Sequence, residues 1–337
     1  MLYCGASEKG TDGGIVMIYR DLYREGCSIL TAAGVPEADL DARILLEYAC
    51  HTNRNDLLVH GDLEVSREQE ELYLESIAKR RERIPLQHIT GEQCFCGLDF
   101  KVNEHVLIPR QDTEVLVERV LKDLKPGMRI LDMCTGSCCI LISLLSLSGS
   151  GPSGENVKDC GGPEGFKERN GAGVCRACSG VGVDISKDAL EVAKENARRL
   201  LGEEALIVQN GQVVGDDAKG VQFVESDLFA SVSGTYDVIV SNPPYIPSDV
   251  ICTLMPEVKN HEPLLALDGT KNGLYFYKRI AEESPAYLKK GGRLYFEIGH
   301  NQAYAVSTLM AAAGFEKIEV IKDYAGLDRV ACGRYPG

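Results

Sequence analysis

Short apolar runs alternate with helical patterns from residue 129 to the end of the chain, and this alternation restricts the fold more than any other feature of the sequence. Buried strands are predicted at residues 129–133, 180–184, 221–225, 237–240, 293–298, 317–322 and 329–333. Helices are predicted at residues 139–147, 187–201, 275–288 and 302–313. Alternation of this kind predicts an α/β domain with a largely parallel sheet.

The first part of the chain has a different character. Residues 1–14 are Gly-rich and polar, which is typical of a loose end. Residues 15–84 carry helical apolar stripes, and Asp39, Asp41 and Ser66 are the expected helix starts. We interpret this segment as a small helical domain that docks a substrate, although a purely structural role fits the sequence equally well.

Two segments flank or interrupt the α/β domain, which we expect to run from residue 111 to 337. Residues 85–110 predict short strands, around 95–102 and 106–108, that form a β-hairpin linker. Residues 148–180 are rich in Gly and charged side chains and predict a flexible insertion. The insertion holds Cys160, Cys175 and Cys178, one ligand short of a usual zinc site, so no metal is expected.

Composition limits the function. The net charge of −14 argues against a general surface for DNA or RNA, so no direct nucleic-acid partner is expected. No apolar run is long enough to span a membrane, and no signal peptide is evident. The thirteen cysteines are odd in number and sit in apolar runs, which indicates reduced thiols and a cytoplasmic location.

A tight turn of small residues follows the first predicted strand of the sheet and opens a helix. This turn, Cys134-Thr135-Gly136-Ser137-Cys138, lets a ligand approach the backbone at the helix N-terminus. Asp184 ends the second strand, where a carboxylate can accept hydrogen bonds from both ribose hydroxyls, or can cap the next helix. The turn lacks the glycine spacing of a dinucleotide site and the ending of a phosphate loop. S-adenosylmethionine, which has no phosphates, is the adenosine-containing cofactor that fits best.

The stretch S-N-P-P-Y-I-P (241–247) follows a buried strand. Two consecutive prolines fix two φ angles and remove two N–H donors, so the loop is expected to be rigid. Such a loop offers the amide of Asn242, unused carbonyls and the ring of Tyr245. It therefore predicts a socket for a flat, polar group.

These residues resemble a known pattern. S-N-P-P-Y-I-P is similar to the N-P-P-Y signature of methyltransferases that act on planar nitrogens. The chain further resembles the HemK/PrmC family in P-L-Q-H-I-T-G-E (85–92), F-C-G-L-D-F-K-V (95–102), V-L-I-P-R-Q-D-T-E-V-L-V-E (106–118), E-P-L-L-A-L-D-G (262–269), N-G-L (272–274) and Y-A-G-L-D-R-V (324–330). The resemblance covers about residues 20–335, apart from the insertion.

The family methylates the side-chain amide of the glutamine in the Gly-Gly-Gln motif of peptide chain release factors, so the resemblance implies these factors as partners. It also implies a Rossmann-like, seven-stranded, S-adenosylmethionine-dependent methyltransferase domain with an N-terminal helical domain. Carried over, the turn Cys134 to Cys138 faces the methionine part of the cofactor, Asp184 binds the ribose, and Leu228 lies near the adenine. Asn242, Pro243, Pro244 and Tyr245 hold the substrate glutamine, with Asn242 also bordering the cofactor.

One residue departs from the family pattern, because Cys138 stands where the turn usually ends in glycine. A side chain there is expected to crowd the cofactor, or to strain the backbone if the position needs a positive φ. We therefore keep open a non-catalytic, cofactor-binding relative. Two enzymes are kept open beside it, an adenine-N6 methyltransferase of DNA or RNA and a ribosomal-protein glutamine methyltransferase.

The resemblance also suggests how transfer proceeds. The side-chain oxygen of Asn242 and the carbonyl of Pro243 each accept one N–H of the substrate amide, which aims its nitrogen and favours the positive charge that grows on it. Tyr245 stacks on the flat amide and fixes its plane. Arg110 is expected either to contact substrate or to brace the junction of the domains.

Overall fold

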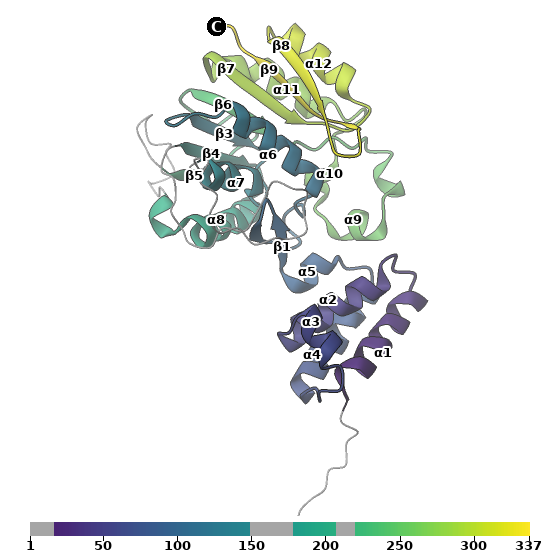
Figure 1. Cartoon of the computed structure of the whole chain (residues 1–337). Coiled ribbons are helices and arrows are strands. Elements are labelled where there is room, and N and C mark those ends of the chain that lie inside the picture. Colours follow the sequence, from purple (N-terminus) through teal and green to yellow (C-terminus); the bar gives the residue numbers. More distant parts are fainter. Residues whose placement is uncertain (1–16, 149–177, 207–219) are drawn as a thin grey trace, which may run out of the picture. The chain divides into compact units, whose positions relative to one another are not determined.

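The computed structural model describes residues 17–148, 178–206 and 220–337 (Figure 1). The expected loose end at residues 1–14 and most of the expected insertion lie outside these residues. Contacts divide the chain into two compact units, Met1–Thr90 and Gly91–Gly337. No helix in the described part of the chain is both long and apolar enough to cross a membrane.

The first unit is a small helical domain. Its helices are α1 Tyr19–Ala32, α2 Ala38–Cys50, α3 Arg54–Val59, α4 Arg67–Arg81 and α5 Leu86–Thr90. Leu22, Leu30, Leu45, Leu46, Tyr73 and Ile77 are among the fully buried side chains of its core. Burial of this apolar area is the main force that holds the unit together.

Ser66 begins α4 as expected from the sequence. Its hydroxyl accepts a hydrogen bond from Gln69 N, and the Gln69 side chain accepts one from Ser66 N, which is a complete capping box. The expected helix starts at Asp39 and Asp41 are wrong, because Glu37 is the N-cap of α2. Asp41 is instead buried and accepts a hydrogen bond from Arg80 Nε at 2.7 Å.

The second unit contains a seven-stranded sheet in the order β5-β4-β3-β6-β7-β9-β8. The strands are β3 Arg129–Met133, β4 Ser179–Asp184, β5 Val221–Glu225, β6 Tyr236–Ser241, β7 Leu288–Glu297, β8 Glu316–Lys322 and β9 Asp328–Arg334. Strand β9 runs antiparallel to both neighbours, and the other pairs are parallel. The expected Rossmann-like, seven-stranded α/β domain and the helical domain that precedes it in the sequence are therefore confirmed.

In the described part of this unit, five helices cover the two faces of the sheet: α6 Gln111–Asp123, α7 Cys139–Leu147, α8 Lys187–Leu201, α11 Tyr275–Glu283 and α12 Ala303–Ala312. Two short helices, α9 Pro256–His261 and α10 Leu264–Leu267, lie in the connection between β6 and α11. Side chains alternate between faces along a strand, so Ile130 of β3 packs in the core with α6, α7 and α8, and Leu131 packs in the core with α11 and α12.

Three expectations about the second unit are wrong in detail. The helix expected at residues 275–288 ends at Glu283, because Pro285, which lacks an N–H, lies in the first turn of the short 3₁₀ helix η3 Ser284–Ala286. Residues 92–101 do form a hairpin, β1 Glu92–Phe95 with β2 Leu98–Lys101, but residues 106–108 form no strand. The expected insertion extends too far, since Ser179 and Gly180 belong to β4.

Candidate functional site

A pocket opens at the carboxyl ends of β3, β4 and β6, on either side of the point where the strand order reverses. Open α/β sheets bind their ligands at this point. The space between its lining residues is about 1120 Å³, a figure that includes space open to solvent. Of the residues singled out from sequence, Cys134, Thr135, Gly136, Ser137, Asp184, Leu228, Asn242 and Pro244 line it. Cys138, Pro243 and Tyr245 do not.

The turn after β3 is held by hydrogen bonds to the next strand. Thr135 N donates to Val183 O at 2.9 Å, and Gly136 N donates to Asp184 Oδ2 at 2.9 Å. The Thr135 hydroxyl donates to Asp132 Oδ2 at 2.5 Å. The turn is thus fixed before any ligand arrives, which favours binding.

Asp132 is a fully buried carboxyl beneath this turn that the sequence analysis did not single out. Burial raises its pKa to about 7. Its Oδ1 has no hydrogen-bond partner among the described residues. An acidic residue inside a buried strand was the available signal, because such residues are rare without a partner.

Asp184 is tied to the backbone through both carboxylate oxygens. Oδ1 accepts a hydrogen bond from Ser186 N at 2.9 Å, and Oδ2 accepts the bond from Gly136 N. Burial raises its pKa, although the backbone N–H groups oppose that shift. Ser186 caps α8 by accepting a hydrogen bond from Ala189 N, so the capping role considered for Asp184 is wrong.

Three residues other than glycine adopt left-handed conformations in the loops that form the pocket. Cys134 has φ +60°, Cys138 has φ +65° and Leu228 has φ +48°. Each costs about 1–2 kcal/mol relative to the usual conformation. Strained residues of this kind cluster where loops must present backbone to a ligand.

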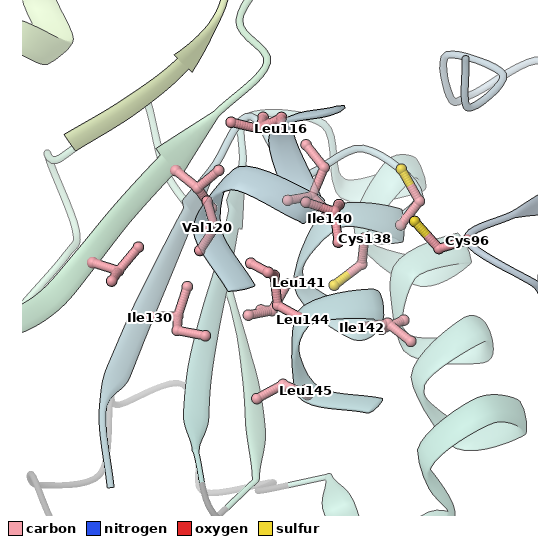
Figure 2. Packing of buried hydrophobic residues seen from close by; sticks show 14 of the residues in the cluster. Cys96, Leu116, Val120, Ile130, Cys138, Ile140, Leu141, Ile142, Leu144 and Leu145 are labelled. Atoms are coloured by element: carbon pink, nitrogen blue, oxygen red, sulfur yellow. The ribbon is translucent and has the colours of Figure 1, made fainter. Parts of the chain in front are cut away.

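The side chain of Cys138 points into the core. It is 0% exposed and belongs to the buried cluster with Ile140, Leu141 and Leu144 (Figure 2). Cys138 does not line the pocket, so its thiol is not placed to crowd a cofactor there, as had been expected. Cys138 does have a positive φ, so the other expected consequence of the missing glycine, a strained backbone, does apply to it.

The S-N-P-P-Y loop begins where β6 ends beside β3. Ser241 is buried, and its hydroxyl donates to Met133 O at 2.6 Å, which joins the loop to the turn after β3. The Asn242 side chain lines the pocket and makes no hydrogen bond with another described residue. Its amide is therefore available to a ligand.

Tyr245 does not line the pocket, and neighbouring residues pack closely around its backbone. Its carbonyl accepts a hydrogen bond from Gln302 Nε2 at 3.0 Å. A Cβ on Gly273 would overlap that carbonyl oxygen, and a Cβ on Gly269 would lie 2.7 Å from Tyr245 Cα. The glycines of the D-G and N-G-L stretches are thus needed for close packing against this loop.

Arg110 lines the pocket within the second unit. Its Nη2 donates to both carboxylate oxygens of the buried Glu262, each at 2.7 Å. This pair connects the loop before α6 to the loop before α10. This ion pair lies inside the second unit, at the rim of the pocket, and is not the brace between domains that was one of the two expected roles of Arg110.

Sequence reasoning missed several lining residues, among them His105, Thr113, Ile185, Ser226, Leu265 and Phe276. Leu265 lies in E-P-L-L-A-L-D-G and Thr113 lies in V-L-I-P-R-Q-D-T-E-V-L-V-E, so these two motifs were signals for them. The other residues lie beside the stretches singled out and carry no distinctive chemistry. In the parts of the chain that the structure describes, no group of three or more His, Cys, Asp or Glu residues is placed to hold a metal. Cys160 and Cys175 lie outside those parts, and Cys178 is buried.

Comparison with known proteins gives consistent matches. Residues 21–91 match the family described as PrmC N-terminal domain. A release factor glutamine methyltransferase from Agrobacterium fabrum is 36% identical over 307 residues, which are 89% of this chain and 92% of that protein. One from Clostridium botulinum is 35% identical over 323 residues, 94% of this chain and 99% of that protein. A solved protein-(glutamine-N5) methyltransferase (release factor-specific) from Alicyclobacillus acidocaldarius is 27% identical, with a TM-score of 0.35 over 71% of this chain and 100% of that one.

Proposed function

We propose that this chain, which belongs to the release factor glutamine methyltransferase family, methylates the glutamine side-chain amide in the Gly-Gly-Gln motif of peptide chain release factors. One observation carries the proposal. Asn242, an amide with no protein partner among the described residues, lines the same pocket as Asp184 and the turn at Cys134–Ser137. An acceptor for a substrate amide thus lies beside a site suited to an adenosine-containing cofactor. We expect the reaction to take place in the cytoplasm, where release factors act.

The residues of the pocket fit S-adenosylmethionine. Asp184 presents a carboxylate, fixed by two backbone N–H groups, to the ribose hydroxyls. The turn at Cys134–Ser137 offers backbone to the methionine part, and buried Leu228 offers an apolar contact to the adenine. When bound, S-adenosylmethionine supplies a methyl group on a positively charged sulfur.

Asn242 and Pro243 act on the substrate amide. The Asn242 side-chain oxygen accepts one N–H, and the carbonyl of Pro243, which accepts no hydrogen bond from the described residues, takes the other. Both acceptors favour the positive charge that develops on the amide nitrogen. The prolines keep them in place, so little reorganisation is needed. Pro244 and Tyr245 border the amide from the same loop.

The function is tested by mass spectrometry of a purified release factor after incubation with this protein and S-adenosylmethionine. We expect a mass gain of one CH₂ group on the Gly-Gly-Gln peptide and none when that glutamine is replaced by alanine. No gain with the cofactor bound would favour another substrate, which ribosomal protein and adenine-containing DNA and RNA would reveal in parallel. No gain without cofactor binding would favour a non-catalytic relative.

Cys138→Gly is expected to change the Kd for S-adenosylmethionine by less than about threefold, since the thiol does not line the pocket. Glycine relieves the left-handed strain, about 1 kcal/mol, and the lost buried thiol costs a similar amount, so the free energy of unfolding stays within about 1 kcal/mol. Calorimetric titration and urea unfolding measure both. Cys138→Ala, which removes the thiol but keeps the strain, is the matched control and is expected to be less stable. A tenfold change in Kd for the glycine variant would show that Cys138 does act on the cofactor.

A further inference from the structure

Glu297 is a buried carboxyl that the proposed reaction has not used. It is the last residue of β7, the neighbour of β6 in the sheet, so it lies beside the start of the S-N-P-P-Y loop. The residue is 2% exposed. The Tyr245 hydroxyl donates to Glu297 Oε1 at 3.4 Å, at the long end of hydrogen-bond distances. The carboxyl at the end of β7 thus contacts the hydroxyl of a tyrosine in the loop that follows the neighbouring strand β6.

The carboxyl is not part of a structural ion pair. Its Oε2 makes no hydrogen bond of good geometry among the described residues, although the Thr113 hydroxyl lies near enough to the carboxyl to favour its ionised form. Arg329, a cation whose charge acts on the Glu297 carboxyl, is bound to Asp323 at 3.1 Å and to Asp112 at 3.0 Å. Burial without full pairing is costly. A carboxyl that only braced the fold would be expected to have more partners than this one.

Other hydrogen bonds hold the backbone at Glu297 and Tyr245, and the Glu297 carboxyl contacts the side chain of Tyr245. The Tyr277 hydroxyl donates to Glu297 O at 2.9 Å, and Gln302 Nε2 donates to Tyr245 O at 3.0 Å. Gln302 Oε1 in turn accepts from Gly299 N at 3.0 Å. Both main chains are therefore held independently of the carboxyl. Within the described parts of the chain, the Tyr245 hydroxyl has Glu297 as its single hydrogen-bond partner.

We propose that Glu297 is a positioning residue for methyl transfer: it accepts the hydrogen of the Tyr245 hydroxyl and thereby fixes the plane of the ring against the substrate amide. The inference rests on the proposed function, because the ring is assigned there to the substrate glutamine. Glu297 itself touches no substrate. Its effect is expected in kcat, since the ring orients the amide for the transfer step, and not in the affinity for S-adenosylmethionine.

The proposal predicts how activity changes with pH. Burial raises the pKa of Glu297 to about 7, opposed by the Thr113 hydroxyl, Arg329 and Tyr245 and assisted by Asp112. The carboxyl is therefore neutral below about pH 7 and ionised above it. An ionised acceptor holds a hydroxyl more strongly than a neutral one. Transfer is expected to become faster as the pH rises through 7.

Stability is expected to change in the opposite direction. The pKa of Glu297 is raised in the folded state, so its contribution to stability is fully present below the pKa of the unfolded chain and is lost as the pH rises through about 7. Glu297→Gln removes this loss. At pH 8 the variant is expected to unfold at the same temperature as the unchanged protein or a higher one, which separates lost positioning from lost folding.

A double-mutant cycle tests the proposal on the full chain with a release factor as substrate. At pH 8, Glu297→Gln and Tyr245→Phe are each expected to lower kcat about tenfold, and the double variant no further, because each removes the hydrogen bond between the hydroxyl and an ionised carboxylate. The unchanged protein is expected to gain activity through pH 7, and Glu297→Gln to show a flat profile. Multiplied losses in the double variant, or a rising profile in Glu297→Gln, would overturn the proposal. Glu114→Gln, at a buried carboxyl that accepts a hydrogen bond from Cys96 N outside the pocket, is the matched control with unchanged kcat.

A readout without activity separates this inference from the proposed function. In protein labelled with ¹³C at tyrosine Cζ, the Tyr245 resonance is identified by its loss in Tyr245→Phe. We expect it to shift with a midpoint near pH 7, and the shift to vanish in Glu297→Gln. A resonance that does not change with pH would contradict the contact, even if release factors are methylated. A shift in a protein that methylates no release factor would retain the contact and reject the proposed function.

Discussion

Asn242→Ala is expected to lower kcat for methylation of a release factor by about 10³-fold, the effect typical of removing a preorganised polar group from a transition state. The alanine cannot accept an N–H of the substrate amide, so the nitrogen is neither aimed nor stabilised as positive charge develops. The Kd for S-adenosylmethionine is expected to change little, because Asp184 and the turn at Cys134–Ser137 remain. Single-turnover kinetics and calorimetric titration measure the two quantities.

Two further variants show whether the lost group is the acceptor oxygen. Asn242→Asp keeps an acceptor in the same place and is expected to retain clearly more activity than the alanine variant. Asn301→Ala removes an exposed amide outside the pocket and is expected to leave kcat unchanged. Equal activity of Asn242→Ala and the unchanged protein would reject the proposed mechanism.

The sequence predicted the second unit well where the signal is local. The strand at residues 129–133 and the helices at 139–147 and 187–201 begin and end where the structure has them. Apolar period and small-residue turns determine these elements over short distances. Asp184 and Asn242 could be singled out for the same reason, since each ends a recognisable strand.

The remaining features depend on contacts between distant residues. The direction of the Cys138 side chain is set by the core around α7. The sequence shows only that a cysteine stands where the family pattern has glycine, which does not reveal where its side chain points. Glu297 and Tyr245 are 52 residues apart, and β6 and β7 bring them together only because they are neighbours in the sheet. Helix α11 ends early because of Pro285, a signal that was present in the sequence but was outweighed by its apolar pattern.

Gly273→Ala is expected to lower methyl transfer about 10²-fold, the cost of a misplacement near 1 Å in a reacting group, and to reduce the free energy of unfolding by on the order of 3 kcal/mol. Gly273 has φ +70°, and a Cβ there would overlap the carbonyl oxygen of Tyr245. That oxygen belongs to the backbone, so the S-N-P-P-Y loop itself must shift. Urea unfolding and kcat at saturating S-adenosylmethionine measure the two losses.

Gly314→Ala separates this overlap from the cost of the backbone conformation. Gly314 has φ +90°, and a Cβ there would meet no atom within 4 Å. The control variant is expected to lose only about 1 kcal/mol of stability and no activity. If Gly273→Ala lost no more than this control, the close packing of Gly273 against Tyr245 would not be what holds the loop in place. A larger loss of kcat in Gly273→Ala, at a temperature where both variants are folded, would mean that the position of the loop, not the stability of the fold, limits methyl transfer.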